Sequence, residues 1–400
     1  FTQPKSVILD QIMFWQSPSR HSGLDRSNHG LPCRGFFYGE TMFENFDIGI
    51  LYSRSGTYQL MSQALFAGAM SAIEDVNADT ALPIRFTPIV RDPAGDLTNY
   101  APMCAEILST SNARHVVGCV TSSSRKEVIP ELDRAQATLW YNVPYEGFET
   151  SARVVYSHAA TNQNILPILG WAMRHFGMSA FLAGSNYIWG WETCRVARTR
   201  LEASGGTVPG ERYLPLGDTS VEGLIAEIER CRPKFILNSL VGASSYAFIR
   251  AYAELGRRDP QFAPEYCPLL SCNLTEAELP VLGDAAEGLI SVGPSFCDTP
   301  TAEGRGSSLE RTAYQSVMTL AAVLAQGVRG PFDCYLAEHG ARHGIDPVTQ
   351  HKTLDVHIAQ VRGGVFQILH SWHDIAPDPY LTRPLRHPQF KKTTLTAVHA

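Results

Sequence analysis

The segment spanning residues 114–150 constrains the fold of this chain more than any other part of the sequence. A short apolar run ending at Val117 leads into a small, hydroxyl-rich turn at residues 118–124, and a stretch with helical spacing follows it. A second apolar run at residues 138–141 then breaks before Pro144. Strand, polar loop, helix and strand in this order predict a βαβ unit of a parallel sheet.

Both loops of this unit leave the carboxyl ends of their strands, where open α/β sheets bind ligands. The first loop contains Val120, Thr121 and Ser122, and it offers hydroxyl groups together with the free N–H groups of a helix start. The second strand ends on the phenol of Tyr141. We therefore expect a small, polar, uncharged molecule to bind at this edge of the sheet.

The length and composition indicate a globular protein of two lobes. A chain of 400 residues is longer than one hydrophobic core usually serves. The sequence has 44% hydrophobic and 18% charged residues, which is typical of soluble proteins. Its net charge of −6 predicts no direct nucleic-acid binding. The sequence contains no run of 18 apolar residues, so we expect no membrane-spanning helix.

Nine cysteines are spread along the chain, and most lie inside apolar segments. We interpret them as buried reduced thiols, which predicts a reducing compartment and therefore a cytoplasmic protein, with the periplasm as the alternative. The closest pair, Cys267 and Cys272, lacks nearby histidines and a second cysteine pair. The sequence therefore predicts no metal site, and nothing in it indicates a cofactor.

Signatures of catalysis are missing from the sequence, which has no GxSxG, HExxH, P-loop or GxGxxG motif. Cys119 could attack an amide carbon once ionised, but it ends an apolar strand and no basic residue stands near it before Arg125, which favours an inert core thiol. Glu146 and Glu149 lie three residues apart in a turn-rich loop, and this spacing favours structural hydrogen bonds over acid–base chemistry. We predict a binding protein that is not an enzyme.

Two series of alternating strand and helix patterns predict two similar lobes, each a parallel sheet flanked by helices. We expect the chain to cross between them three times, near residues 157–161, 289–294 and 330–352. The expected lobes are residues 46–157 plus 293–335 and residues 158–292 plus 336–380. Residues 352–368 alternate around Arg362-Gly363-Gly364, which predicts a hairpin.

The two ends of the chain carry no clear pattern. Residues 1–45 show no convincing secretory signal, because Asp10 and Gln11 interrupt their only apolar stretch. We expect these residues to be an extraneous or disordered extension, with Met42 as the natural start. Residues 381–400 are expected to be a loose tail.

Several short segments together resemble one known family. The most specific are PYEGFE at residues 144–149 and NQN at residues 162–164, and further matching segments are residues 47–57, 91–96, 117–119, 124–126 and 184–187. Over roughly residues 46–380 the chain resembles the type I periplasmic-binding-protein fold. It is most similar to the short-chain amide and urea branch, above all the amide-sensing negative regulator of aliphatic amidase operons.

The resemblance implies a clamshell that binds a small amide between two lobes. The cytoplasmic member of the branch restrains an RNA-binding antitermination protein until the amide arrives, so the resemblance implies such a partner and a homo-oligomer is left open. Other members deliver urea, amides or branched-chain amino acids to ABC permeases. A solute receptor of an ABC transporter is therefore the alternative function.

The resemblance also implies the residues of the site. It puts Ser122, Tyr141 and Pro144 on the wall of the first lobe, with Val143 beside them, and Tyr187 on the facing wall. The residues alone leave open a helix-capping role for Ser122 and a core role for Tyr141.

Three positions depart from the amide sensor. Val120 stands where the sensor has a tyrosine, Val143 where it has a threonine, and Trp189 where it has a further tyrosine. Two hydrogen-bonding groups are thereby lost, so we expect a more apolar pocket that admits a larger amide.

Overall fold

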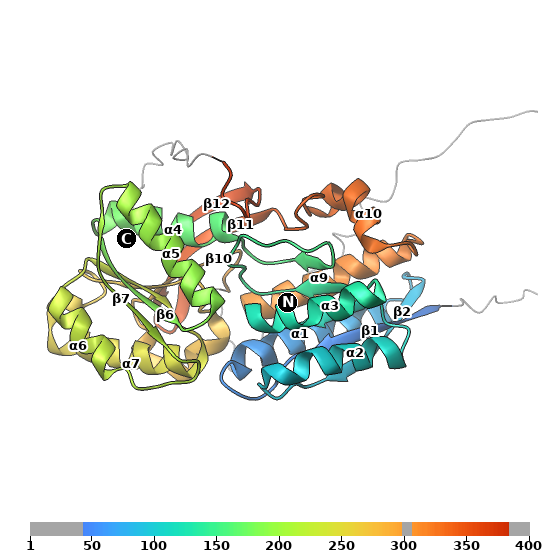
Figure 1. Cartoon of the computed structure of the whole chain (residues 1–400), viewed down its shortest axis with the longest axis horizontal. Helices are drawn as coiled ribbons and strands as arrows, with labels where there is room; N and C mark the ends of the chain where they lie inside the picture. The colour runs from blue at the N-terminus through green and yellow to red at the C-terminus, as the bar shows by residue number, and fades with distance from the viewer. Residues whose placement is uncertain (1–42, 298–305, 384–400) are drawn as a thin grey trace, which may run out of the picture. The chain divides into compact units, whose positions relative to one another are not determined.

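The computed structural model describes residues 43–297 and 306–383, which fall in one compact unit built around two sheets (Figure 1). The expectations for residues 1–42, for the start at Met42 and for most of the tail lie outside the described residues. The first strand begins at Glu44, so two residues of the expected extension belong to the sheet.

The first sheet has five parallel strands in the order β2-β1-β3-β4-β5. Its strands are β1 (Glu44–Leu51), β2 (Ile84–Arg91), β3 (His115–Gly118), β4 (Thr138–Tyr141) and β5 (Val154–Tyr156). Its helices are α1 (Gln59–Ala78), α2 (Tyr100–Thr110), α3 (Ser122–Ala135), α9 (Ser308–Ala325) and α10 (Phe332–His339). The βαβ unit predicted for residues 114–141 is confirmed, because β3 and β4 pair in parallel and helix α3 connects them. All four residues of β4 are buried, as in a sheet covered on both faces.

The second sheet has seven strands in the order β12-β11-β10-β9-β8-β6-β7. They are β6 (Ser179–Ser185), β7 (Thr207–Leu214), β8 (Phe235–Ser239), β9 (Leu269–Ser271), β10 (Ile290–Gly293), β11 (Leu354–Arg362) and β12 (Val365–Ile375). The helices with this sheet are α4 (Ile165–His175), α5 (Ile188–Ala203), α6 (Glu222–Cys231), α7 (Gly242–Arg258) and α8 (Leu279–Leu282). Short 3-10 helices complete the two lobes: η2 (Leu97–Asn99), η3 (Thr161–Gln163), η4 (Pro260–Phe262), η5 (Glu276–Glu278), η6 (Gly283–Ala286) and η7 (Gly340–His343).

The second sheet is parallel from β10 to β7 and mixed at one edge. Strand β11 runs antiparallel to both β10 and β12. The predicted hairpin is confirmed, since Arg362 pairs with Val365 across a turn whose Gly363 and Gly364 have φ of +60° and +79°. A two-residue turn of this kind reverses the chain, so the strand after it must be antiparallel.

The two-lobed arrangement with three crossovers is confirmed. The chain passes from the first sheet to the second after β5, returns between β10 and α9, and crosses again between η7 and β11. Leu336 and Ile345, which the sequence analysis expects in the second lobe, belong to the core of the first sheet. The reason is that Phe332 of α10 packs against His115 and Trp140, and this contact holds the following residues on the first lobe.

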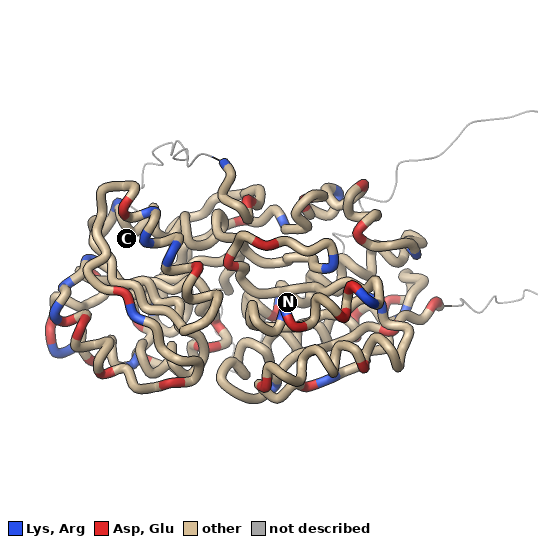
Figure 2. Tube along the Cα trace, viewed as in Figure 1, with Lys and Arg blue, Asp and Glu red and all other residues tan. Residues whose placement is uncertain are grey.

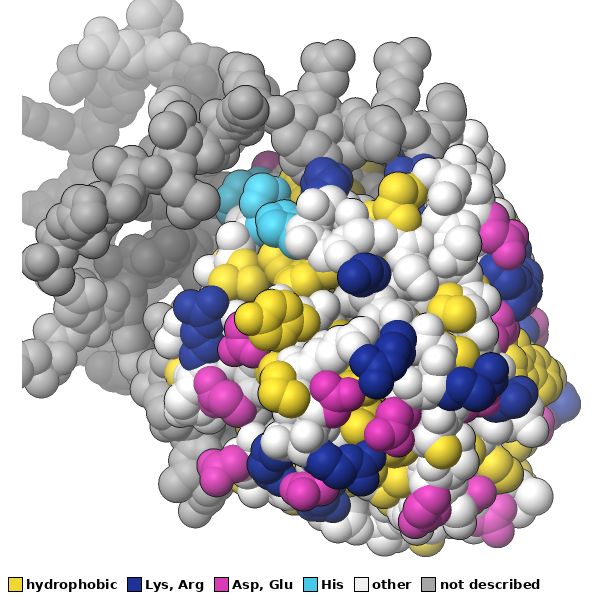
Figure 3. Space-filling model, turned by 90° about the vertical axis from the view of Figure 1, so that its left-hand side faces the viewer, with side chains coloured by type: hydrophobic (Ala, Val, Ile, Leu, Met, Phe, Trp, Pro, Cys, Tyr) yellow, Lys and Arg dark blue, Asp and Glu magenta, His cyan; other side chains and the backbone are white. Residues whose placement is uncertain are grey.

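The surface carries acidic and basic side chains in mixture. Figure 2 shows Lys, Arg, Asp and Glu interspersed along both halves of the trace. Figure 3 shows the same mixture on one face of the molecule, with hydrophobic side chains between the charges. In residues 43–297 and 306–383, no helix combines the length and the apolar character needed to cross a membrane.

Candidate functional site

The carboxyl ends of strands from both sheets meet around one small cavity of about 20 Å³. Its walls are Met61, Val120, Ser122, Tyr141, Val143, Pro144, Tyr187, Trp189, Val241 and Asn273. Most of these residues end or follow strands β3, β4, β6, β8 and β9. This is the edge at which α/β sheets bind ligands, and here two such edges face one another.

The structure brings together seven of the eight residues predicted for the site, namely Val120, Ser122, Tyr141, Val143, Pro144, Tyr187 and Trp189. Thr121 is the exception, because it caps helix α3. Its hydroxyl accepts a hydrogen bond from the Ser124 amide at 3.1 Å, and Ser124 returns a bond to the Thr121 backbone. The capping role considered for Ser122 thus belongs to Thr121.

Behind the first wall lies a buried ion pair between Arg125 and Glu146. Arg125 Nη2 is 2.7 Å from Glu146 Oε1, and Nη1 is 3.4 Å from Oε2. The guanidinium also lies over the rings of Tyr141 and Tyr145, at 4.9 Å from each centroid. Burial lowers the pKa of Arg125, but the Glu146 carboxylate together with Tyr141 and Tyr156 raises it above the ordinary value. The site wall therefore has a fixed charged support that does not itself face the cavity.

Ser122 is connected to this support. Its Oγ donates a hydrogen bond to Glu146 Oε2 at 2.8 Å. On the loop that carries Glu146, Glu149 forms an ion pair with Lys126 of helix α3. The structural role predicted for Glu146 and Glu149 is confirmed by these bonds.

The two tyrosines of the site are neutral phenols. Burial raises the pKa of both Tyr141 and Tyr187. The Tyr141 hydroxyl makes one long hydrogen bond, 3.4 Å to the Val120 carbonyl oxygen. Each phenol therefore keeps hydrogen-bonding capacity for a further partner.

Trp189 presents an unpaired donor. It lies near the start of α5 and is only 4% exposed, yet its indole N–H has no hydrogen-bond partner within the described residues. A buried donor without a partner is rare in native proteins because it has lost its water without compensation. The wall at this position therefore offers a hydrogen-bond donor as well as an apolar surface.

Three lining residues are missing from the predicted site: Met61, Val241 and Asn273. Val241 and Asn273 follow two predicted strands at their carboxyl ends, and that position is the signal that could have found them. Met61 lies in the first turn of α1, where the sequence gives no indication of a binding role.

The lobes approach one another closely beside the cavity. Helix α7 begins at Gly242, which has φ of +57°, and a Cβ atom at this position would lie 2.7 Å from the carbonyl carbon of Thr57 on the first lobe. Only glycine permits this approach without strain or displacement.

Apart from Pro144, which lines the cavity, the segments PYEGFE and NQN contact the region of the crossovers. Asn162 binds the chain after β12 twice, through the Ala376 carbonyl at 2.9 Å and the Asp378 amide at 2.7 Å. The amide of Phe148 donates to the Pro379 carbonyl at 2.9 Å. Residues 376–380, which we call the strap, therefore tie the end of the second sheet to a loop of the first.

Cys119 is an inert core thiol, as predicted. It is fully buried, burial raises its pKa, and its Sγ contacts the Ser124 carbonyl at 3.5 Å. A neutral thiol is a poor nucleophile, so an amidase role for it is disfavoured.

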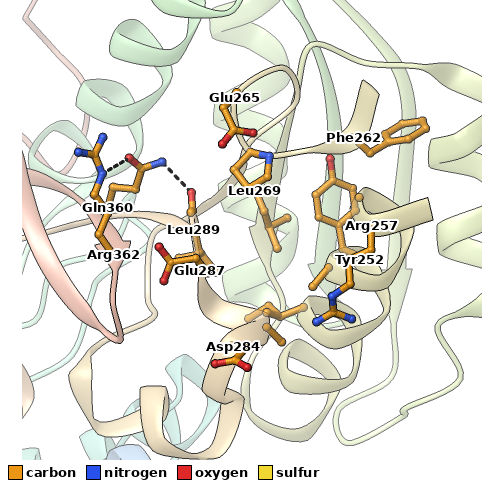
Figure 4. Close-up of a pocket in the computed structure, with 16 residues that line it drawn as sticks. Tyr252, Arg257, Phe262, Glu265, Leu269, Asp284, Glu287, Leu289, Gln360 and Arg362 are labelled. Atoms are coloured by element: carbon orange, nitrogen blue, oxygen red, sulfur yellow. Dashed lines mark hydrogen bonds between the residues drawn. The ribbon is translucent and has the colours of Figure 1, made fainter. Parts of the chain in front are cut away.

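A wider hollow of about 560 Å³ lies on the second lobe (Figure 4). It lies at the starts of β9 and β10, on the edge opposite to the cavity. Figure 4 shows Gln360 bridging Arg362 and the backbone, and these two bonds are both 3.0 Å. We place the candidate site in the smaller cavity, because carboxyl ends from both lobes converge there and Trp189, whose indole N–H is unpaired within the described residues, is among its lining residues.

Comparison with known proteins gives one family and a common fold. A family model described as a periplasmic binding protein domain matches residues 46–305. An ABC-transporter solute-binding protein from Rhodopseudomonas palustris, solved in complex with 4-hydroxybenzoate, is 18% identical with a TM-score of 0.69, covering 83% of this chain and 98% of its own.

Two further solved structures are similar over a comparable length. The branched-chain amino acid transporter substrate-binding protein from Streptococcus pneumoniae, in complex with isoleucine, is 12% identical with a TM-score of 0.65, covering 84% of this chain and 100% of its own. An amino acid ABC transporter substrate-binding protein from Pseudomonas fluorescens is 17% identical with a TM-score of 0.63, covering 84% and 97%. These likenesses concern the fold, and they confirm the predicted type I periplasmic-binding-protein architecture.

Proposed function

Because this chain belongs to the periplasmic-binding-protein domain family, we propose that it is the solute receptor of an ABC transporter and that it binds a small, uncharged amide or urea between its two lobes. The observation that carries this proposal is the cavity, which is lined from both lobes by seven residues predicted for the site. The family and the similar solved structures are binding proteins, which supports a role in binding rather than catalysis.

The chemistry of the cavity supports an uncharged ligand. None of its ten lining residues carries a charge. The nearest cation described above, Arg125, is already bound to Glu146 behind the wall. A buried carboxylate or ammonium without a partner is costly, so a benzoate or a free amino acid fits this cavity less well than an amide.

The size of the cavity supports a short ligand. A volume of about 20 Å³ holds roughly one or two water-sized groups. A larger amide, as the apolar replacements predict, would require the lobes to separate further. Urea, formamide and acetamide are the candidates that require the least separation of the lobes.

We also propose that the two lobes open and close about the three crossovers. The lobes would comprise residues 43–157 with 308–345 and residues 158–293 with 346–380, which shifts the expected boundary at residue 336 to follow the packing of Leu336 and Ile345. Ligand contacts from both walls exist together only when the lobes are closed, so binding favours closure. A permease that reads the closed form would be the partner.

Transport is better supported than amidase regulation. The similar solved structures described above are transporter binding proteins, which favours a periplasmic location and a permease partner over a cytoplasmic location and an antitermination protein. Release of the native protein from intact cells by osmotic shock would support the transport role. Retention in the cytoplasm together with an RNA-binding protein would instead support the regulator.

Binding is tested by thermal shift with urea, formamide and acetamide, and with isoleucine and 4-hydroxybenzoate as charged comparisons. A ligand that binds only the folded protein raises the melting temperature, with about 2.7 kcal/mol of stabilisation at a hundred times Kd. The same thermal shift is measured on the variant Ser122→Ala, which alters a residue of the cavity wall. Ser123→Ala is its matched control, because Ser123 is the neighbouring serine and does not line the cavity. Stabilisation by the charged compounds alone would contradict the proposal.

A further inference from the structure

The cavity contains two polar groups whose hydrogen-bonding direction is fixed by their surroundings. We infer that Ser122 and Trp189 impose a polarity on the ligand: Trp189 donates to a ligand carbonyl oxygen, and Ser122 accepts from a ligand N–H group. In this arrangement Glu146 is a positioning residue for Ser122. The inference rests on the proposed function, because it concerns the same site.

Trp189 can act only as a donor. An indole nitrogen carries one N–H group and has no lone pair available to accept a hydrogen bond. This N–H is enclosed and unpaired within the residues that the structure describes, while the side chain lines the cavity. A ligand oxygen beside it would supply the missing partner, which gives the second lobe a direct hold on the ligand.

Ser122 can act only as an acceptor toward the cavity. Its one hydroxyl proton is directed to Glu146, because a carboxylate accepts hydrogen bonds and has none to give. Glu146 is in turn held by two nitrogens of Arg125, so this direction does not reverse easily. The remaining lone pairs of Ser122 Oγ are then available to a ligand N–H.

The other polar groups of the cavity impose no such direction. The hydroxyls of Tyr141 and Tyr187 can donate or accept. Asn273 can likewise offer a donor or an acceptor, because its Nδ2 makes one bond, to the Leu240 carbonyl at 3.1 Å, and its Oδ1 accepts one, from Ser271 Oγ at 3.2 Å. Ser122 on one lobe and Trp189 on the other therefore decide the polarity.

The matching ligand carries an N–H donor and a carbonyl oxygen on the same carbon atom, as primary amides and ureas do. A ketone of the same shape keeps the bond to Trp189 and loses the bond to Ser122. An aliphatic amine keeps only the bond to Ser122. The polarity thus separates amides from molecules of equal size, which shape alone cannot do.

Acetamide and acetone form the test pair, because they have nearly the same shape and only acetamide has an N–H group. We expect titration calorimetry on the full chain to give about tenfold weaker binding of acetone than of acetamide. Ser122→Ala should weaken acetamide about tenfold and leave acetone unchanged. Trp189→Phe should weaken both ligands by a similar factor.

Trp191→Phe is the control for Trp189→Phe, because Trp191 lies in the same helix, is 46% exposed and already donates to Asn186 Oδ1 at 3.0 Å. It should leave both affinities unchanged. Glu146→Gln should reduce the difference in affinity between acetamide and acetone. A glutamine amide can donate to Ser122 Oγ, and the Ser122 hydroxyl proton is then free to bind a ketone oxygen. If Glu146 has a purely structural role, Glu146→Gln should weaken the binding of both ligands equally.

An NMR measurement on the unaltered protein supports the test where a variant fails to fold. With tryptophans labelled by ¹⁵N, the indole N–H signal of Trp189 should shift downfield when acetamide is added. This signal is identified by its absence in Trp189→Phe or, where that variant fails to fold, as the one indole signal that acetamide moves. Equal weakening of both ligands by Ser122→Ala, or no effect of acetamide on any indole signal, would overturn the inference. Absence of any binding of amide or urea to the unaltered protein would instead overturn the proposed function.

Discussion

Glu278 gives the prediction with the clearest magnitude. This carboxyl is 1% exposed, accepts a hydrogen bond from the Tyr246 hydroxyl at 3.0 Å, and accepts a second from the Thr275 amide at 2.9 Å. Burial raises its pKa from 4.5 to about 7, although the two hydrogen bonds act in the opposite direction. The folded protein therefore holds a proton on Glu278 over a pH range in which the unfolded chain has lost it.

The effect on stability follows from the two pKa values. A carboxyl whose pKa is raised on folding contributes stability that is fully present below its unfolded pKa of 4.5 and is lost as the pH rises through about 7. At 1.36 kcal/mol for each pKa unit, the full contribution is about 3 kcal/mol, and about 2.5 kcal/mol of it disappears between pH 5 and pH 8.

Glu278→Gln removes this dependence, because glutamine stays neutral at both pH values and can still accept from the Thr275 amide. Guanidinium chloride denaturation at pH 5 and pH 8 should show that the stability of the variant relative to the original protein rises by about 2.5 kcal/mol between the two. Glu254→Gln is the control, since Glu254 is an exposed carboxyl paired with Arg257. A difference between variant and original that is the same at both pH values would refute the reasoning.

Three further predictions concern binding and acid stability. Tyr141→Phe should weaken acetamide binding by about 0.5–1.5 kcal/mol, the usual worth of one hydrogen bond, and an unchanged calorimetric affinity would mean that Tyr141 is only a core residue. Gly242→Ala should hold the lobes apart at Thr57, so that acetamide affinity falls and the radius of gyration by X-ray scattering stays large when ligand is added. Gly223→Ala is its control because a Cβ there meets open space, and equal behaviour of the two variants would contradict the steric explanation. Burial lowers the pKa of His115, His158 and His351 to about 4, 3 and 4. Their contribution to stability is therefore present above the unfolded pKa of 6.5 and is lost as the pH falls toward these folded values. Calorimetric unfolding in two buffers should show the corresponding proton uptake.

Local pattern was sufficient for the parts of the fold that depend on neighbours in sequence. The unit from β3 to β4 follows from hydrophobic spacing, and the β11–β12 hairpin follows from Gly363 and Gly364. The direction of β11 beside β10 could not be predicted in this way. That pairing joins Ile290 to Gln360, which are 70 residues apart, and no local pattern specifies it.

The site was predictable where a residue's chemistry coincides with its place at a strand end. Ser122 and Tyr141 satisfy both conditions, and the structure puts them in one cavity. The unpaired N–H of Trp189 could not be predicted, because it depends on which groups of the whole fold fail to reach it. The bond from Ser122 to Glu146 is also a product of tertiary packing, since it joins residues 24 positions apart.

The contacts of the strap connect the positions of the two lobes to a residue on the protein surface. Its Tyr380 is 42% exposed and bonds to Thr150 Oγ1 at 2.7 Å, while the next residue back, Pro379, binds the Phe148 amide. These contacts join segments more than 200 residues apart in sequence, at the crossover rather than at the cavity. If the lobes move about the crossovers as proposed, a fluorophore beside Tyr380 would report that movement optically without touching the ligand.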